Sequence, residues 1–77
     1  MNNVVSFAGR LRDARTAAGL TRKELAVKAG ISWQAIRAWE QGTREPGLSR
    51  ILSLAVALDI GVARLMGFYN AKERGSC

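Results

Sequence analysis

Two side chains in the segment from Ser32 to Gln41 have hydrogen-bonding groups that match the edges of nucleic-acid bases. The amide of Gln34 can pair with N6 and N7 of adenine, and the guanidinium of Arg37 can donate to both O6 and N7 of guanine. Arg37 can equally bind a phosphate group, so its role stays open between base and backbone. The chemistry that this segment offers is recognition by hydrogen bonding.

Catalytic chemistry is not indicated by the composition. The 77 residues contain no histidine, and their one cysteine, Cys77, is the last residue. A thiol–imidazole pair, a zinc finger or an internal disulfide cannot be assembled from this set. The sequence shows no carboxylate pair, no nucleophile with a base and no phosphate-binding glycine loop. We therefore expect a protein that is not an enzyme and has no cofactor, metal or evident small-molecule ligand.

The charge of the chain favours an anionic partner. Twelve Lys and Arg against six Asp and Glu give a formal charge of +6. A polyanion is the natural partner of so basic a small chain, although a solvated basic surface gives the same count. No stretch approaches the roughly 18 apolar residues that span a bilayer, and residues 1–5 lack the basic start of a signal peptide. We expect a cytoplasmic protein without a membrane partner.

The potential base-reading residues follow a predicted helix and a tight turn. Thr21 and Glu24 have the spacing of a capping box, which opens a helix. Gly30 supplies the left-handed backbone position that ends this helix, and Ile31 follows as a buried turn residue. With so short a connection the next helix must cross steeply, which is the geometry of a helix-turn-helix.

The second helix of this motif is predicted from Ser32, its N-cap, to Gln41, with Gly42 as its stop. Its apolar residues fall on one stripe that should face the core, consisting of Ala35, Ile36 and Trp39. The side chains left for the exposed face include Gln34 and Arg37. Such a helix can lie in the major groove of DNA.

The rest of the chain predicts more helices. Residues 6–19 have a helical stripe with Ser6 as N-cap, and a last short helix ends at Gly67. Between them, after a loop over residues 43–47, a fourth helix has an apolar stripe of Leu48, Ile51, Leu52, Ala55 and Leu58. We expect one all-α domain over residues 1–77, a compact bundle of about five helices. Its ordered core should span about residues 6–69, with a flexible tail over residues 70–77.

Together these motifs resemble the DNA-binding domains of the lambda repressor and Cro family, often called the XRE family. The resemblance covers about residues 7–67 and rests on Leu20-Thr21-Arg22-Lys23-Glu24-Leu25-Ala26, Gly30-Ile31-Ser32, Ile36, Trp39-Glu40-Gln41-Gly42 and Glu45-Pro46. It implies a sequence-specific regulator of transcription that binds double-stranded DNA, either repressor-like or restriction-controller-like. The alternative is an antitoxin-like protein-interaction module whose DNA binding is autoregulatory.

The resemblance also implies roles for individual residues. Base contact is assigned to the first turn of the recognition helix and one turn further on, which here are Trp33, Gln34, Arg37 and Ala38. Trp33 can lie against a thymine methyl group or a sugar, or can cover the end of the preceding helix. Phosphate contacts are expected from Arg22, Lys23, Ser32 and Arg44, with Lys28, Arg10 and Arg50 as further candidates.

Two structural contacts complete the expectations. In similar proteins an arginine at the position of Arg15 pairs with a glutamate at the position of Glu40, so a structural ion pair is implied; the alternative is a solvated arginine. A homodimer on a pseudo-palindromic operator is also expected, because one recognition helix reads only about four or five base pairs. Its interface is expected at Ile60, Val62, Leu65, Met66, Phe68 and Tyr69. The alternative is that Val62, Leu65 and Met66 close the monomer core.

Overall fold

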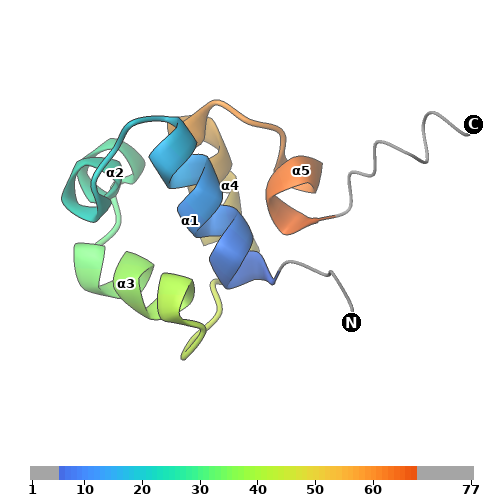
Figure 1. Cartoon of the computed structure of the whole chain (residues 1–77), viewed down its shortest axis with the longest axis horizontal. Coiled ribbons are helices and arrows are strands. Elements are labelled where there is room, and N and C mark those ends of the chain that lie inside the picture. The colour runs from blue at the N-terminus through green and yellow to red at the C-terminus, as the bar shows by residue number, and fades with distance from the viewer. Residues whose placement is uncertain (1–5, 68–77) are drawn as a thin grey trace, which may run out of the picture.

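The computed structural model of the chain describes residues 6–67. These residues contain no strand, and their helices follow in the order α1 (Phe7–Ala17), α2 (Arg22–Ala29), α3 (Trp33–Gln41), α4 (Leu48–Leu58) and α5 (Val62–Met66). Figure 1 shows α1 in front of α4, with α2 and α3 on one side of this pair and α5 on the other. The predicted all-α bundle of five helices is confirmed, whereas the predicted tail over residues 70–77 lies outside the described residues.

Local signals set the ends of α2 and α3. The Thr21 hydroxyl accepts a hydrogen bond from the backbone N–H of Glu24 at 3.0 Å, and the Glu24 carboxylate accepts one from the N–H of Thr21 at 2.8 Å. Gly30 ends α2 with φ at 70°, in the left-handed region that favours glycine. Ser32 caps α3 by accepting from the N–H of Ala35 at 3.2 Å. The predicted capping box, turn glycine and N-cap are confirmed.

Each helix contributes one completely buried side chain to the core. These residues are, in helix order, Leu11, Leu25, Ile36, Leu54 and Leu65. Trp39 lies among them with 7% of its surface exposed, as its helical spacing predicts. Burial of each of these side chains stabilises the folded protein by roughly 1.5 to 3 kcal/mol. The core therefore fixes one face of every helix, including the inner face of α3.

The predicted stripe of α4 is only partly correct. Leu48 and Leu52 were expected in the core, but they are 64% and 45% exposed, and Leu54 is completely buried. Apolar residues occur on nearly every side of this helix, so their spacing does not select the buried face. Contacts with α2 and α5 make that selection. The exposed side of α4 has a row of apolar residues four positions apart, consisting of Leu48, Leu52 and Val56, which we call the α4 row.

The segment around α5 is more buried than expected. Leu65 is only 1% exposed within the monomer, so its predicted place on a dimer interface is wrong. Ile60, Val62 and Met66 are partly buried and pack against the core, which favours the alternative that this segment closes the monomer. The reason is that α5 lies against both α1 and α4. Two further interface candidates, Phe68 and Tyr69, lie outside the described residues.

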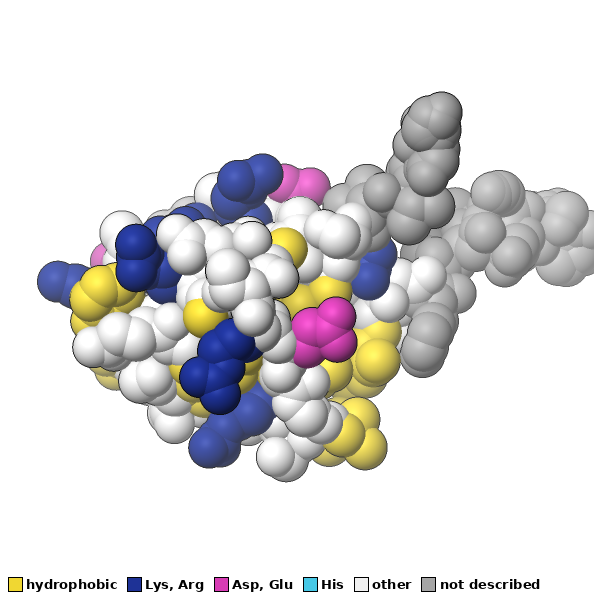
Figure 2. Space-filling view, turned by 90° about the horizontal axis from the view of Figure 1, so that it is seen from below, with side chains coloured by type: hydrophobic (Ala, Val, Ile, Leu, Met, Phe, Trp, Pro, Cys, Tyr) yellow, Lys and Arg dark blue, Asp and Glu magenta, His cyan; other side chains and the backbone are white. Residues whose placement is uncertain are grey.

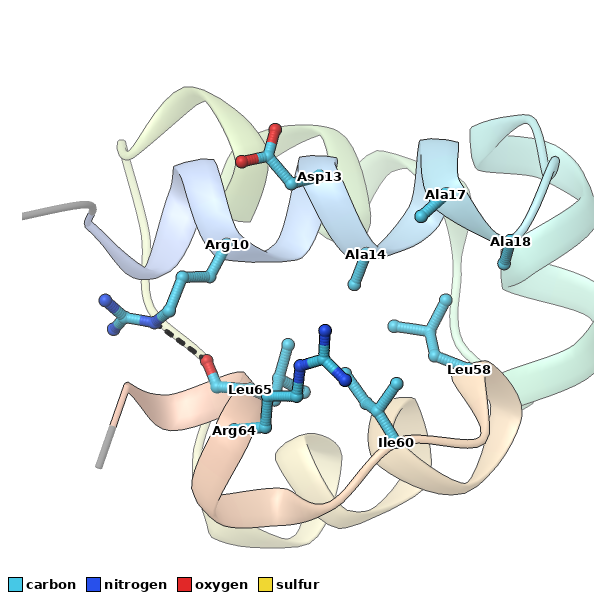
Figure 3. Close-up of a pocket in the computed structure, with 9 residues that line it drawn as sticks. All are labelled: Arg10, Asp13, Ala14, Ala17, Ala18, Leu58, Ile60, Arg64 and Leu65. Atoms are coloured by element: carbon cyan, nitrogen blue, oxygen red, sulfur yellow. Dashed lines mark hydrogen bonds between the residues drawn. The ribbon is translucent and has the colours of Figure 1, made fainter. Parts of the chain in front are cut away.

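The end of α5 is tied to α1 by an arginine. Nε of Arg10 donates to the backbone carbonyl of Leu65 at 2.9 Å, drawn as the dashed line in Figure 3. Gly67 ends α5 with φ at 85°, and a Cβ atom there would lie 2.5 Å from Cζ of Arg10. Position 67 therefore favours glycine for its left-handed backbone, whereas the guanidinium of Arg10 lies at the end of a flexible side chain and can shift away from a Cβ atom. Arg10, a further phosphate candidate from the sequence, joins α1 to α5 through its Nε.

Candidate nucleic-acid interface

The exposed side of α3 presents the residues expected to contact bases. Gln34 and Arg37 are exposed, Trp33 is 36% exposed and Ala38 is half-buried. Positions three and four apart lie on the same side of an α-helix, so Gln34 and Arg37 share one face, with Trp33 and Ala38 at its edges. The opposite face is locked into the core by Ile36, together with Trp39. The helix thus offers a fixed surface that combines hydrogen-bonding and apolar groups.

Basic side chains surround this face. Figure 2 views the molecule from the side on which α3 lies in Figure 1, with Lys and Arg side chains spread across the face and few acidic ones among them. Arg44 lines a hollow together with Gln34 and Ala38, so the loop after α3 borders the same face. Ser32 lines that hollow as well, and its hydroxyl oxygen already accepts from the N–H of Ala35. Its O–H can still donate to a phosphate.

A buried carboxylate fixes α3 to α1. The side chain of Glu40 is completely buried, and Nε of Arg15 donates to its Oε2 at 2.6 Å. Nη2 of Arg15 donates to Oε1 at 3.0 Å, so the pair is bidentate. Nη1 of Arg15 also donates to the carbonyl of Leu20. Arg15 and Glu40 therefore form the ion pair that the resemblance implied, and the pair sets the angle between α1 and α3.

Arg22 is a second partner of the same carboxylate. Its Nε donates to Oε1 of Glu40 at 3.0 Å, while 34% of its side chain remains exposed. From the sequence only a phosphate contact was predicted for Arg22, and no local signal could reveal this pair because 18 positions separate the two residues. Two guanidinium groups on one carboxylate leave an excess positive charge at the first turn of α2. The α2 terminus is therefore both anchored to α3 and cationic.

The protonation of this cluster follows from its contacts. Burial acts to raise the pKa of Glu40, but the hydrogen bonds from Arg15 and Arg22 outweigh it and hold that pKa below its ordinary value. The hydrogen bond to Glu40 raises the pKa of Arg15 despite desolvation of the guanidinium. Glu40 is consequently an anion at neutral pH, and the three groups form a stable charged cluster behind α3.

Lys23 lies beside the first residue of α3. Its Nζ is 5.7 Å from the centroid of the Trp33 ring, within the range of a cation–π contact. Trp33 therefore packs against α2, as one of the sequence alternatives proposed, and still keeps about a third of its surface open. Lys23 belongs to the first turn of α2, where the helix dipole favours an anion.

Other surfaces of the described chain offer no comparable chemistry. A hollow of about 600 Å³ lies between α1 and the α4–α5 segment, where Figure 3 shows Ala14 and Ala18 opposite Leu58 and Ile60, with Arg64 between them. Within residues 6–67, no group of three or more His, Cys, Asp or Glu could hold a metal ion. In the same part of the chain, no helix is long and apolar enough to cross a membrane.

Comparison with other sequences identifies relatives of this chain. A family model described as helix-turn-helix matches residues 11–65. An uncharacterized HTH-type transcriptional regulator of Sinorhizobium fredii is 38% identical over 53 residues, which are 69% of this chain and 27% of that protein. An uncharacterized transcriptional regulator in the ATPase CF(0) region of Rhodospirillum rubrum is 35% identical over 66 residues, covering 86% and 58% of the two chains. The present chain thus spans less than two thirds of these curated relatives.

Solved structures show the same fold. The restriction-modification controller protein C.AhdI from Aeromonas hydrophila has 43% sequence identity and a TM-score of 0.76, over 79% of this chain and 92% of that one. The P22 c2 repressor, solved in complex with a synthetic operator, has 27% identity and a TM-score of 0.76, over 82% and 96%. The first of these proteins is a controller and the second a repressor bound to a synthetic operator. The matched residues 11–65 include the whole of α2, α3 and the turn between them, so the family is one of transcription regulators and not of enzymes. This chain belongs to the lambda repressor-like helix-turn-helix family.

Proposed function

We propose that this protein regulates transcription by binding a specific double-stranded DNA sequence through the exposed face of α3. The observation that carries the proposal is the position of Gln34 and Arg37, which are exposed on a helix whose other side is fixed in the core by Ile36. The regulators of transcription among its relatives, and the operator complex of the similar P22 c2 repressor, support it. The likeness to C.AhdI supports a controller-like role.

The contacts that we propose divide into two classes. Gln34 reads adenine in the major groove, and Arg37 reads guanine or binds a phosphate there. Lys23, Ser32 and Arg44 bind the phosphate groups on either side of α3, and fix the helix in its register. Arg22 joins this phosphate set through the part of its guanidinium that Glu40 does not engage.

We also propose that two copies bind one pseudo-palindromic operator. A twofold axis would place the two α3 helices in successive major grooves about 34 Å apart. Because Leu65 is buried, we place the contact between copies at the α4 row, in which Val56 is 81% exposed. Sedimentation of a Leu52→Glu, Val56→Glu variant tests this assignment, with Ala63→Glu, an exposed position, as the matched change on α5. A wild type that stays monomeric at tens of micromolar and on DNA would rule out the dimer.

The experiment that tests the function is selection of bound duplexes from random DNA. We expect enrichment of two related half-sites whose centres are about one helical turn apart. Binding of the selected duplex should fall by about 10³ to 10⁵ between 50 and 200 mM salt, because roughly six to ten phosphates are neutralised per dimer. Failure to enrich any sequence would contradict sequence-specific binding, and affinity independent of salt would contradict the phosphate contacts.

A second candidate function is an antitoxin-like interaction module that also regulates its own transcription. The observation that favours it is the α4 row, because exposed apolar side chains on one helix face can bind another protein. The two functions differ in what lies beside the coding sequence. A neighbouring reading frame of toxin size, whose product binds this chain and is released by Leu52→Glu, would favour the module.

A further inference from the structure

Trp33 borders an apolar hollow at the start of α3. The ring is 36% exposed, and Nζ of Lys23 lies 5.7 Å from its centroid. The hollow beside the ring is lined from α2 and the turn by apolar side chains of Ala26, Val27 and Ile31. Val27 is 83% exposed, so the hollow is open to solvent. An apolar recess with a cationic group at its rim therefore lies at the edge of the recognition face.

The recess adjoins a side chain that can read a base. Gln34 follows Trp33 directly in the first turn of α3 and lines the same hollow. Trp33 is the residue before Gln34 in the same turn of α3, so with Gln34 on one base pair we place Trp33 at the edge of the neighbouring one. Among the groups that the four base pairs present there, the C5 methyl group of thymine is the apolar one. 5-Methylcytosine carries a methyl group on the same ring carbon.

We propose that Trp33 and this hollow bind the C5 methyl group of a pyrimidine next to the base that Gln34 reads. The protein then distinguishes thymine or 5-methylcytosine from uracil or unmodified cytosine at one position of each half-site. Lys23 contributes by holding the indole ring in place, which lowers the cost of ordering it when DNA binds. The proposal rests on the proposed function, because it requires α3 to lie in the major groove.

The test changes single methyl groups in the selected duplex. Replacing each thymine of one half-site in turn with deoxyuridine removes a methyl group and leaves every base-pairing group unchanged. We expect wild-type protein to lose about fourfold in affinity at one position. This is the effect of losing the burial of one methyl-sized apolar group. Where a cytosine occupies that position, changing it to 5-methylcytosine should strengthen binding by about the same factor.

Two variants connect the effect to the side chain. Trp33→Ala should bind the methylated and unmethylated duplexes equally, because the apolar contact is lost. Gln34→Ala is the matched change at the next residue and should keep the methyl dependence of wild type. Circular dichroism of both variants checks that they remain folded, as expected for side chains on the surface.

The outcomes separate this proposal from the function on which it rests. A wild-type protein with a preferred duplex but no position sensitive to a methyl group would overturn the methyl contact and leave DNA recognition intact. The same conclusion follows if Trp33→Ala keeps the wild-type ratio of affinities. A protein that prefers no duplex at all would overturn both proposals.

Discussion

The helices α3 and α5 are both tied to α1 by an arginine, but the two ties differ in kind. Arg15 holds α3 through the buried carboxylate of Glu40, which also binds Arg22 from α2. Arg10 holds α5 through a backbone carbonyl, that of Leu65. The first tie joins three helices through paired charges, and the second adds a hydrogen bond from a guanidinium to a backbone carbonyl to the apolar packing.

This difference matches what each helix has to do. A bidentate ion pair constrains direction as well as distance, so it fixes the orientation of α3 and of its exposed face. Apolar packing around Leu65 is not directional. It holds α5 against the core, which is enough for a helix whose task is to cover the core. Removing one charge of a buried pair should therefore cost more than removing the hydrogen bond of Arg10.

The largest expected effect comes from Glu40→Gln. The change leaves the guanidinium of Arg15 desolvated without its charged partner, so the free energy of unfolding should fall by about 3 to 5 kcal/mol. Urea unfolding measures this loss. Glu45→Gln, an exposed glutamate in the loop after α3, is the matched control and should change stability by less than about 0.5 kcal/mol. A Glu40→Gln protein as stable as wild type would show that the pair does not hold α3.

The second largest effect is expected from a change in the apolar packing that holds α5. Leu65→Ala should destabilise the protein by about 2 to 3 kcal/mol, the lower part of the range for a buried leucine, because so short a helix can shift to fill the cavity. Hydrogen exchange should then speed up in α5 while the amides of α2 and α3 stay protected. Equal loss of protection in all three helices would mean that the two regions are not held independently.

Acid should weaken the ion pair between Arg15 and Glu40 specifically. Because the pKa of Glu40 is lowered in the folded state, the unfolded chain binds more protons between the two pKa values. The stability from this group is complete above the ordinary glutamate pKa of about 4.3 and is lost as pH falls through the lowered value. Thermal unfolding from pH 6 to pH 2 should show this loss in wild type and a smaller one in Glu40→Gln. Parallel curves for the two proteins would contradict the assignment.

The smallest effect is expected for Arg10→Met. The variant loses the donor to the Leu65 carbonyl but keeps an unbranched side chain, so it should cost about 1.5 kcal/mol. Arg64→Met, an exposed change on α5 itself, should be close to neutral. Thermal melts of the two variants side by side provide the comparison. A loss for Arg10→Met as large as that for Glu40→Gln would remove the distinction between the ties.

The sequence predicted best where structure is set by neighbours in the chain. The capping pair Thr21 and Glu24, the turn at Gly30 and the N-cap Ser32 all act within a few residues, and each lies where the spacing placed it. The exposed face of α3 followed from the same local logic, since Ile36 and Trp39 define its inner side. The pairing of Arg15 with Glu40 was predicted from the family resemblance and not from local spacing.

Local sequence patterns could not predict the contacts between segments that are distant in the chain. The buried side of α4 depends on α2 and α5, so a helix with apolar residues all round was assigned Leu48 and Leu52 in place of Leu54. The second partner of Glu40 and the bond from Arg10 to Leu65 join residues 18 and 55 positions apart. Only the packed structure places these arginines, and it shows that Arg10 links α1 to the end of α5.

The most direct measurement of the central claim compares Gln34→Ala and Arg44→Ala on two duplexes, the selected sequence and a random one. If α3 reads bases through its exposed face, Gln34→Ala should lose about 1 to 3 kcal/mol, or about 5- to 150-fold, on the selected duplex and almost nothing on the random one. Arg44→Ala, which removes a phosphate contact, should weaken both duplexes by a similar factor. If Gln34→Ala instead weakens both duplexes alike, α3 does not lie in the groove as described.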